Sequence, residues 1–168
     1  MTYFPLALLS LIFTVLAYIL TLTGILALFL QDNNKLPWWL SWFDTPDNLT
    51  IGDELYRNNQ MKGVTNRWWI ATCWLARNPA YGFDHVVGAK VPEGFTYSSK
   101  GDELTTNAPI HNGWVFRQID NAWQFYAVYQ WSDTKCWKLN FGWKLWGRLE
   151  AGQVRQLVCT ITPFAKVA

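Results

Sequence analysis

The residues with the clearest chemical potential are a group of oxygen-bearing side chains in the first third of the chain. They are Asp44, Asp47, Asn48, Asp53 and Glu54. Carboxylate and amide oxygens are the ligands that a hard cation such as Ca²⁺ prefers, but the ligand spacing of an EF-hand loop is not met. Asp and Asn also cap helices and close turns with the same oxygens, and capping is the alternative for the whole cluster. We therefore predict no metal site and leave the role of the cluster open.

Histidine and cysteine offer little for catalysis. His85 and His111 stand outside the HExxH pattern of zinc proteases, and Cys73, Cys136 and Cys159 form no CxxC pair. A thiol hydrolase needs a Cys, a His and an orienting Asp or Asn brought together, and no local sequence supports that grouping. We expect no catalytic residue, no cofactor and no enzymatic activity.

A second group of candidates lies on the polar side of the C-terminal strands. From Gly113 onward there are seven basic and three acidic residues, and Arg117, Lys138 and Lys144 lie close to tryptophans. Such a surface can bind anionic lipid head groups or single-stranded nucleic acid, and an ordinary solvated strand face is the alternative. The whole chain has 14 Lys and Arg against 12 Asp and Glu. This balance argues against a sequence-specific nucleic-acid partner.

The elements that must position these residues begin with an apolar N-terminus. No charged side chain precedes Asp32, and residues 4–30 are apolar apart from a few Thr, Ser and Tyr and one Gly. As a helix this run is roughly 40 Å long, enough to cross a hydrocarbon core of about 30 Å. Residues 1–31 are predicted to form one uncleaved transmembrane helix. A signal peptide, a buried core helix, or two helices turning at Thr23-Gly24 are the alternatives, and the orientation stays open.

Residues 32–48 form a Trp-rich segment directly behind this helix. The segment contains Trp38, Trp39, Trp42 and Phe43. Indole rings favour the membrane–water interface, because the ring is apolar and its N–H remains hydrated. We predict an interfacial collar followed by a turn. The alternative is that these rings cap the core of the following domain.

Residues 49–168 are predicted to form one small α+β domain. From about 113 to 163 apolar and polar residues alternate in four runs. This period predicts a four-stranded antiparallel meander with a buried aromatic face and a wet polar face. A short helix, Asn66 to Arg77 with Thr65 as its N-cap, is the expected cover for the aromatic face. The segment from Tyr81 to Ile110 is predicted to be loops with one or two short strands.

Three strings of residues carry a resemblance to a known family. They are Trp42–Asn48 (WFDTPDN), Arg77–Phe83 (RNPAYGF) and Gly142–Leu145 (GWKL). Over most of its length the chain resembles a family of uncharacterised tailed-bacteriophage proteins with an apolar N-terminus. The resemblance implies a phage origin and a bacterial host, and it carries over no catalytic residue.

These observations predict a non-enzymatic phage protein held in the host inner membrane by a single-pass helix. It would act as a binding module at the host envelope, in host takeover or superinfection exclusion. The expected partners are the lipid bilayer and a host-envelope or phage protein, and the oligomeric state is left open. A holin or lysis regulator is one alternative. A virion structural or DNA-entry component is another alternative. These alternatives stay open because fold class alone does not decide function.

Overall fold

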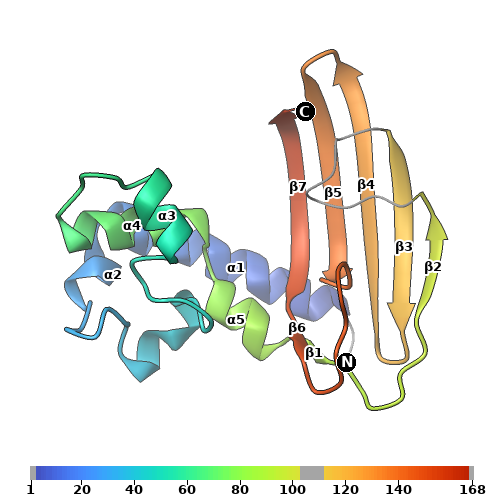
Figure 1. The fold of residues 1–168 in the computed structure, drawn as a ribbon, viewed down its shortest axis with the longest axis horizontal. Helices are drawn as coiled ribbons and strands as arrows, with labels where there is room; N and C mark the ends of the chain where they lie inside the picture. Colours follow the sequence, from blue (N-terminus) through green and yellow to red (C-terminus); the bar gives the residue numbers. More distant parts are fainter. Residues whose placement is uncertain (1–2, 103–111, 167–168) are drawn as a thin grey trace. The chain divides into compact units, whose positions relative to one another are not determined.

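The computed structural model describes residues 3–102 and 112–166, and the chain folds into two compact units (Figure 1). The helical unit is Thr2–Val86 and the sheet unit is Val87–Ala168. The predicted mixed α+β class is confirmed. The units do not coincide with the sequence-based division at residues 31 and 48, because the apolar N-terminus and the Trp-rich segment pack into the same unit as the later helices.

Six helical segments make up the described part of the helical unit. They are α1 (Tyr3–Leu22), α2 (Ile25–Leu28), the 3₁₀ helix η1 (Trp38–Phe43), α3 (Glu54–Asn59), α4 (Arg67–Arg77) and α5 (Tyr81–Val86). Helix α1 contacts α2, α4 and α5, and η1 packs against α5. The main core cluster of the unit consists of Ala17, Leu26, Leu36, Leu40, Phe43 and Leu75.

The apolar N-terminus is divided into two helices, so the predicted continuous helix to Leu30 is wrong. The Thr23 hydroxyl donates a hydrogen bond to the Ile19 carbonyl over 2.8 Å, and Gly24 takes a left-handed conformation with φ 74°. Glycine adopts this conformation without the steric cost that other residues have, and it ends α1 there. Helix α1 still has 20 residues, and within the described ranges it is the one helix long and apolar enough to cross a membrane. A signal sequence or a buried core helix would meet the same criterion.

Helix α4 lies almost where the sequence predicts it. Its N-cap is Asn66, one residue after the expected Thr65, and the Asn66 side chain accepts a hydrogen bond from the Trp69 N–H over 3.1 Å. The buried residues of the helix include Trp74 and Leu75, and α4 contacts α1 and α2. These contacts lie within the helical unit, whereas the prediction had placed this helix over the sheet.

The sheet unit contains the predicted antiparallel meander with one additional strand. The five-stranded sheet has the order β2-β3-β4-β5-β7 (Figure 1). Its strands are β2 (Ser98–Gly101), β3 (Gly113–Ile119), β4 (Ala122–Ser132), β5 (Lys135–Trp143) and β7 (Leu157–Lys166). A separate two-stranded sheet pairs β1 (Ala89–Lys90) with β6 (Val154–Arg155). The sheet therefore has five strands and a small neighbour, where four strands were expected.

The buried face of the central strands is the one that the sequence marks as polar. In β4, Gln124, Tyr126 and Val128 are buried, whereas Tyr129 and Trp131 on the aromatic side are exposed. The predicted burial is thus reversed over most of the sheet. The physical reason is that the polar groups of this face are paired with one another: the Gln124 side-chain amide donates to Asn140 over 2.9 Å. A buried polar side chain is tolerated when it is hydrogen-bonded.

Candidate interaction surfaces

Helix α1 directs most of its large apolar side chains outward. We call this surface the α1 outer face, and it consists of Phe4, Leu8, Leu9, Leu11, Ile12, Val15, Leu16, Ile19 and Leu22, all exposed. The buried residues of α1 are Tyr3, Leu6, Ala7, Ser10, Ala17 and Thr21, and Phe13 and Leu20 on the same side pack against the core. The α1 outer face is thus as apolar as the covered side, whereas a surface helix of a water-soluble protein has a polar outer face.

The inner side of α1 is held by α5 and η1. The Ser10 hydroxyl donates a hydrogen bond to the Asp84 carboxylate over 2.6 Å. The Phe13 ring is stacked on Phe83, with 4.4 Å between ring centroids, and meets the edge of Trp42 at 5.0 Å. These contacts hold α1 against one charged and several aromatic side chains from residues far away in the sequence.

Gly82 is the residue that allows α5 to approach η1 so closely. A Cβ atom at this position would lie 2.0 Å from the carbonyl oxygen of Ser41 and 2.9 Å from that of Asp44. Both obstacles are backbone atoms, so a larger side chain would push the two helices apart. The glycine in the RNPAYGF string thus has a packing role, which the sequence alone did not reveal.

The Trp-rich segment divides its rings between solvent and core. Trp38, Trp39 and Trp42 are exposed, and Trp38 exposes 85% of its surface. Trp39 meets the edge of the Phe29 ring at 5.1 Å. Phe43 is buried in the main core cluster of the helical unit, so its predicted interfacial position is wrong.

Two further exposed tryptophans were not singled out from the sequence. Trp68 and Trp69, in the first turn of α4, are 51% and 57% exposed. They were not singled out because the sequence of α4, apolar nearly all round, predicted only that the helix is buried or lies in the membrane interface. Adjacent residues of a helix do not lie on the same face, and this spacing is the signal that at least one of the two is not in the core.

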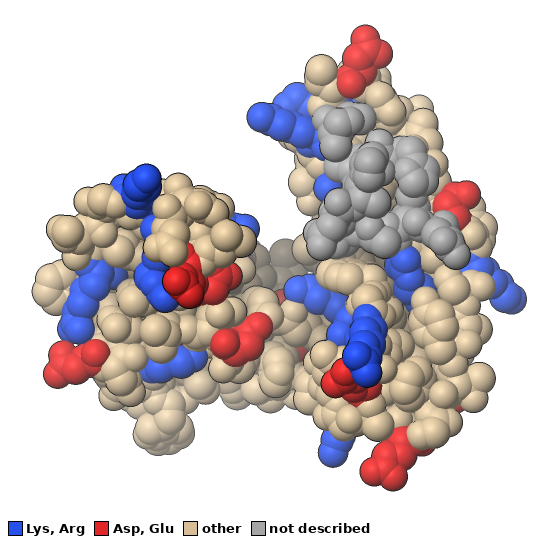
Figure 2. Space-filling view, in the orientation of Figure 1, with Lys and Arg blue, Asp and Glu red and all other residues tan. Residues whose placement is uncertain are grey.

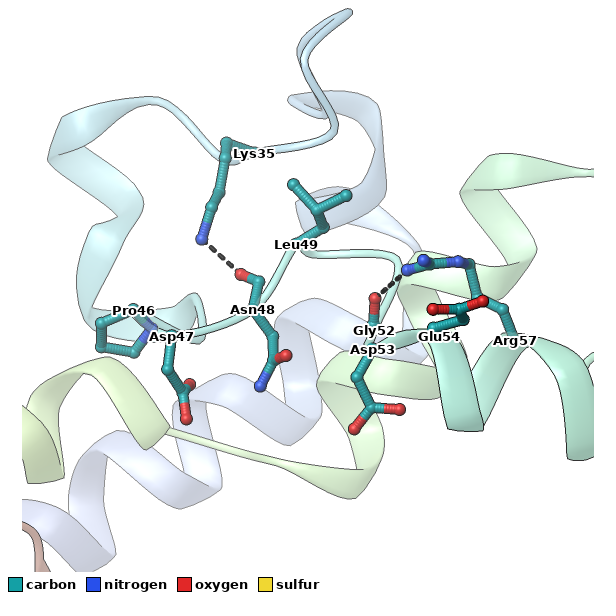
Figure 3. A pocket seen from close by; sticks show the side chains of 9 residues that line it. All are labelled: Lys35, Pro46, Asp47, Asn48, Leu49, Gly52, Asp53, Glu54 and Arg57. Atoms are coloured by element: carbon teal, nitrogen blue, oxygen red, sulfur yellow. Dashed lines mark hydrogen bonds between the residues drawn. The ribbon is translucent and has the colours of Figure 1, made fainter.

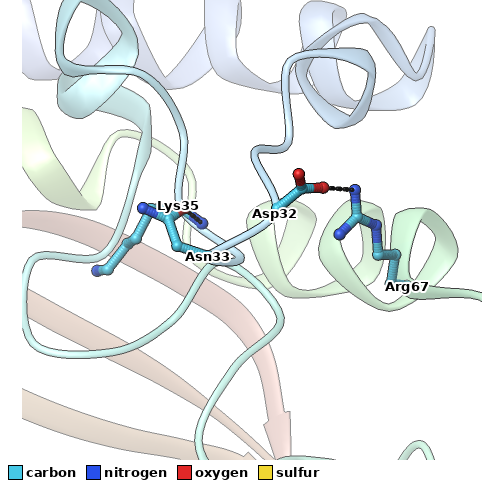
Figure 4. Close-up of polar contacts among 4 residues, drawn as sticks. All are labelled: Asp32, Asn33, Lys35 and Arg67. Atoms are coloured by element: carbon cyan, nitrogen blue, oxygen red, sulfur yellow. Dashed lines mark hydrogen bonds and ion pairs between the residues drawn. The ribbon is translucent and has the colours of Figure 1, made fainter.

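A polar turn follows the apolar N-terminus (Figure 4). Asp32, the first charged residue of the chain, forms a 3.4 Å ion pair with Arg67 at the start of α4. The Lys35 N–H donates to the Asn33 side-chain oxygen over 3.0 Å. The Lys35 ammonium donates to the carbonyls of Thr45, over 2.9 Å, and of Asn48. The first charges after α2 therefore tie the turn to α4 and to the next loop.

Asp47, Asn48, Asp53 and Glu54 of the acidic cluster line a hollow of about 350 Å³ together with Lys35 and Arg57, among others (Figure 3). Asp53 caps α3 by accepting a hydrogen bond from the Tyr56 N–H over 2.7 Å. Asp47 accepts from the Tyr81 hydroxyl over 3.1 Å. In the part of the chain that the structure describes, no three His, Cys, Asp or Glu side chains come together as a metal site.

Asp44 is the structural centre of this loop. It is buried, and its carboxylate accepts hydrogen bonds from the Thr50 hydroxyl over 2.8 Å and the Leu36 N–H over 3.2 Å. The next residue, Thr45, accepts from the Trp74 indole N–H over 3.1 Å. The oxygens of this cluster therefore cap and cross-link the loop, which is the alternative that the sequence analysis gave.

The three basic candidates on the sheet do not form a common exposed surface. Arg117 is buried on β3, and Lys138 and Lys144 are half-buried. The Lys144 ammonium donates to the Gln156 side chain over 2.5 Å and lies 5.8 Å from the ring centre of Trp146. On the face shown in Figure 2, basic and acidic side chains are interspersed. The predicted basic face for lipid or a partner is therefore not present as such.

The sheet carries a separate surface that is aromatic. The aromatic sheet face is defined by Trp114, Phe116, Phe125, Tyr129, Trp137 and Phe141 on β3, β4 and β5. The register joins Phe116 to Phe125 and Tyr129 to Trp137. Trp114, Tyr129 and Trp137 are exposed and the phenylalanines are half-buried. Trp114, Tyr129 and Trp137 are therefore the members of this face that are accessible to solvent.

The three thiols and the described histidine differ in their burial. Cys136 is fully buried, Cys73 is half-buried and Cys159 is exposed, and all three are free thiols. Burial raises the pKa of the Cys73 thiol, which disfavours the nucleophilic thiolate. His85 lies half-buried on α5, and His111 lies outside the described residues.

Comparison with known proteins identifies a family for this chain but gives no function for it. No curated protein and no solved structure matches the chain. The family DUF7338, described as a family of unknown function, matches residues 1–168. The chain therefore belongs to DUF7338 over its full given length.

Proposed function

We propose that this protein is a non-enzymatic binding module held at a membrane by the α1 outer face. The observation that carries the proposal is the apolar outer face of α1, with Ser10, Ala17 and Thr21 among the residues of its covered side. Small and hydroxyl-bearing residues are enriched where helices pack together inside membranes, while large apolar side chains face lipid. Exposing such a face to water would be unfavourable, and a lipid environment removes that cost.

The membrane proposed is the inner membrane of a bacterial host. The support is the resemblance of the WFDTPDN, RNPAYGF and GWKL strings to tailed-phage proteins. A phage protein with a lipid-facing helix would act at the host envelope, in host takeover or superinfection exclusion.

The proposed partner-binding element is the aromatic sheet face. Aromatic residues are enriched in the buried centres of protein interfaces, because large rigid side chains contribute contact area at low entropic cost. Trp114 and Trp137 are each close to half exposed on this face. A host-envelope or phage protein is the expected occupant, and loss of its capture by a Trp137→Ala variant would support this assignment.

The proposal is tested by fractionation of cells that produce the full chain. The wild-type protein should stay in the membrane pellet after washes with salt and carbonate. The variant Ile12→Gln/Ile19→Gln changes the α1 outer face only and should partition at least about a hundredfold less into membranes, since two buried aliphatic side chains contribute roughly 3–6 kcal/mol.

A matched control carries the same chemical change elsewhere in the helical unit. Leu55 and Val64 are exposed apolar residues outside α1, and Leu55→Gln/Val64→Gln should remain in the membrane pellet. Wild-type protein in the soluble fraction would overturn the proposal. Mass spectrometry of purified phage particles separates the virion alternative, because a virion component would be found there in stoichiometric amount.

A further inference from the structure

Helix α1 is covered along one side by other elements of the helical unit. Around Ser10 it meets α5, around Phe13 it meets α5 and η1, and around Ala17 it meets the core cluster with α2 and α4. The covered side therefore extends from the first half of the helix to its end. A lone membrane-spanning helix would instead contact lipid on all sides.

The position of Asp84 conflicts with a helix that crosses the bilayer. The midpoint of α1 lies between Ile12 and Phe13, so in a spanning helix Ser10 would lie roughly 4 Å from the bilayer centre. The Asp84 carboxylate, 2.6 Å from the Ser10 hydroxyl, would lie there too. A carboxylate at the centre of a bilayer costs about 3 kcal/mol or more.

The irregular backbone that follows η1 also conflicts with a helix that crosses the bilayer. Residues 44–53, which follow η1, are turns and short extended pieces, and Asp44 and Lys35 bond within this loop. Irregular backbone does not occur in contact with the hydrocarbon region of a bilayer. The helical unit therefore places polar, irregular structure behind α1 and large apolar side chains in front of it.

This one-sidedness is typical of a helix that lies in the plane of the membrane surface. Such a helix usually carries its polar face in its own sequence. In α1 both faces are short of charge, and the polar side is supplied by the elements packed against it. The outer face is continuous from Phe4 to Leu22.

Exposed tryptophans contact the apolar N-terminal segment. Trp42 contacts Phe13 of α1, and Trp39 contacts Phe29 just after α2. Indole rings settle at the level of the lipid head groups. Asp32 and Arg67 pair with each other in the turn that follows α2 (Figure 4). Exposed indole rings and the first charges of the chain thus both occur close behind the apolar N-terminal segment.

We propose that α1 lies in one leaflet, parallel to the membrane plane, and that the chain does not cross the bilayer. This inference rests on the proposed membrane association and replaces the single-pass arrangement predicted from the sequence. It places the N-terminus and the sheet unit on the same side of the membrane. It also argues against a holin-like pore, which would require membrane-spanning helices.

The first test measures the depth of α1 in vesicles of phosphatidylethanolamine and phosphatidylglycerol. Single cysteines replace Leu8, Ile12, Ile19 or Leu22 in a full-length variant whose native cysteines are changed to serine or alanine. A nitroxide label at each position is then probed with oxygen and with a water-soluble nickel complex. The four labels should report one shallow depth, about 5–10 Å below the head groups. A label at Leu55 on α3 serves as the control and should stay in water.

A spanning helix gives a different profile. Ile12 and Leu22 are separated by roughly 15 Å along the helix axis, so their depths would differ by nearly that distance. Such a difference would overturn the in-plane arrangement.

The second test determines on which side of the membrane each terminus lies, in the chain with its native cysteines. Small epitope tags at the N-terminus and the C-terminus are treated with protease in spheroplasts and in inverted membrane vesicles. Both tags should be cleaved in the same preparation and protected in the other. Cleavage of the two tags in opposite preparations would overturn the inference while leaving membrane association intact. A chain that remains soluble in fractionation would overturn the proposed function and the inference together.

Discussion

The side-chain amide of Gln124 on β4 donates a hydrogen bond to the side-chain oxygen of Asn140 on β5 over 2.9 Å, inside the sheet unit. The Leu145 N–H in turn donates to the Gln124 side-chain oxygen over 3.1 Å. Gln124 is fully buried and Asn140 nearly so. This pair fixes which face of the sheet is covered, because it binds the segment after β5 back onto β4.

Replacing Gln124 should therefore destabilise the sheet unit. Gln124→Ala leaves the Leu145 N–H and the Asn140 side chain without this partner, and we expect a loss of about 1–3 kcal/mol in the free energy of unfolding. Urea unfolding followed by circular dichroism measures it. Gln118→Ala, at an exposed position of β3, is the control and should change the free energy by less than about 0.5 kcal/mol. Equal losses would show that the amide pair is not the cause.

Trp143 should be the most costly aromatic residue of the sheet to truncate. It is buried, its indole N–H donates to the Val87 carbonyl over 3.4 Å, and its ring meets the edge of Trp123 at 6.2 Å. Trp143→Ala is expected to cost about 3–5 kcal/mol in thermal or urea unfolding. Trp137→Ala, on the same strand but exposed, should cost about 1 kcal/mol or less. The opposite order would contradict the observed burial of the sheet.

Asp44 should matter for the stability of the helical unit and not for cation binding. Asp44→Ala removes the acceptor for the Thr50 hydroxyl and two backbone N–H groups, with an expected cost of about 2–3 kcal/mol. Asp47→Ala should have little effect, since Asp47 is exposed. The melting temperature of the wild type should be the same with added Ca²⁺ and with a chelator. A shift of several degrees on adding Ca²⁺ would restore the metal hypothesis.

The helical unit should lose stability at alkaline pH through Tyr56. Burial raises the pKa of its phenol to about 12, and the charge of Cys73 adds to the shift while Arg77 opposes it. Because the folded pKa lies above the ordinary value of about 10, this stabilisation is fully present below pH 10 and is lost as the pH rises through 12. Tyr56→Phe should flatten the fall in melting temperature between these values. Tyr97→Phe, at an exposed tyrosine, should leave the fall unchanged.

Local signals in the sequence predicted the elements well. The predicted helix Asn66 to Arg77 agrees with α4 to within one residue, although the N-cap is Asn66 and not the expected Thr65, because capping and helix ending depend on neighbouring side chains. The two-residue period predicted β3, β4, β5 and β7 for the same reason. The Asx capping alternative for the acidic cluster also depends on local contacts.

Features that depend on distant partners were not predictable in this way. Which face of β4 is buried depends on Asn140 and Leu145, and the sequence pattern alone favoured the aromatic side. The burial of Arg117 follows from the same reversal. The contact of Ser10 with Asp84 joins residues 74 positions apart, and no periodicity indicates it. The aromatic sheet face proposed to bind a partner belongs to this second class, whereas the apolar run that forms the α1 outer face was recognised from the sequence.

The distance in sequence between α1 and α5 also has a consequence for biosynthesis. Helix α1 leaves the ribosome first, and at about 5–20 residues per second the segment with Phe83 and Asp84 follows it roughly 3–12 s later. During that interval α1 lacks Phe83 and Asp84, although α2 and η1, which cover other parts of its inner side, have already been synthesised. The nascent chain therefore presents a partly uncovered apolar helix to targeting factors and chaperones, and correct folding depends on keeping that helix accessible until α5 has been synthesised.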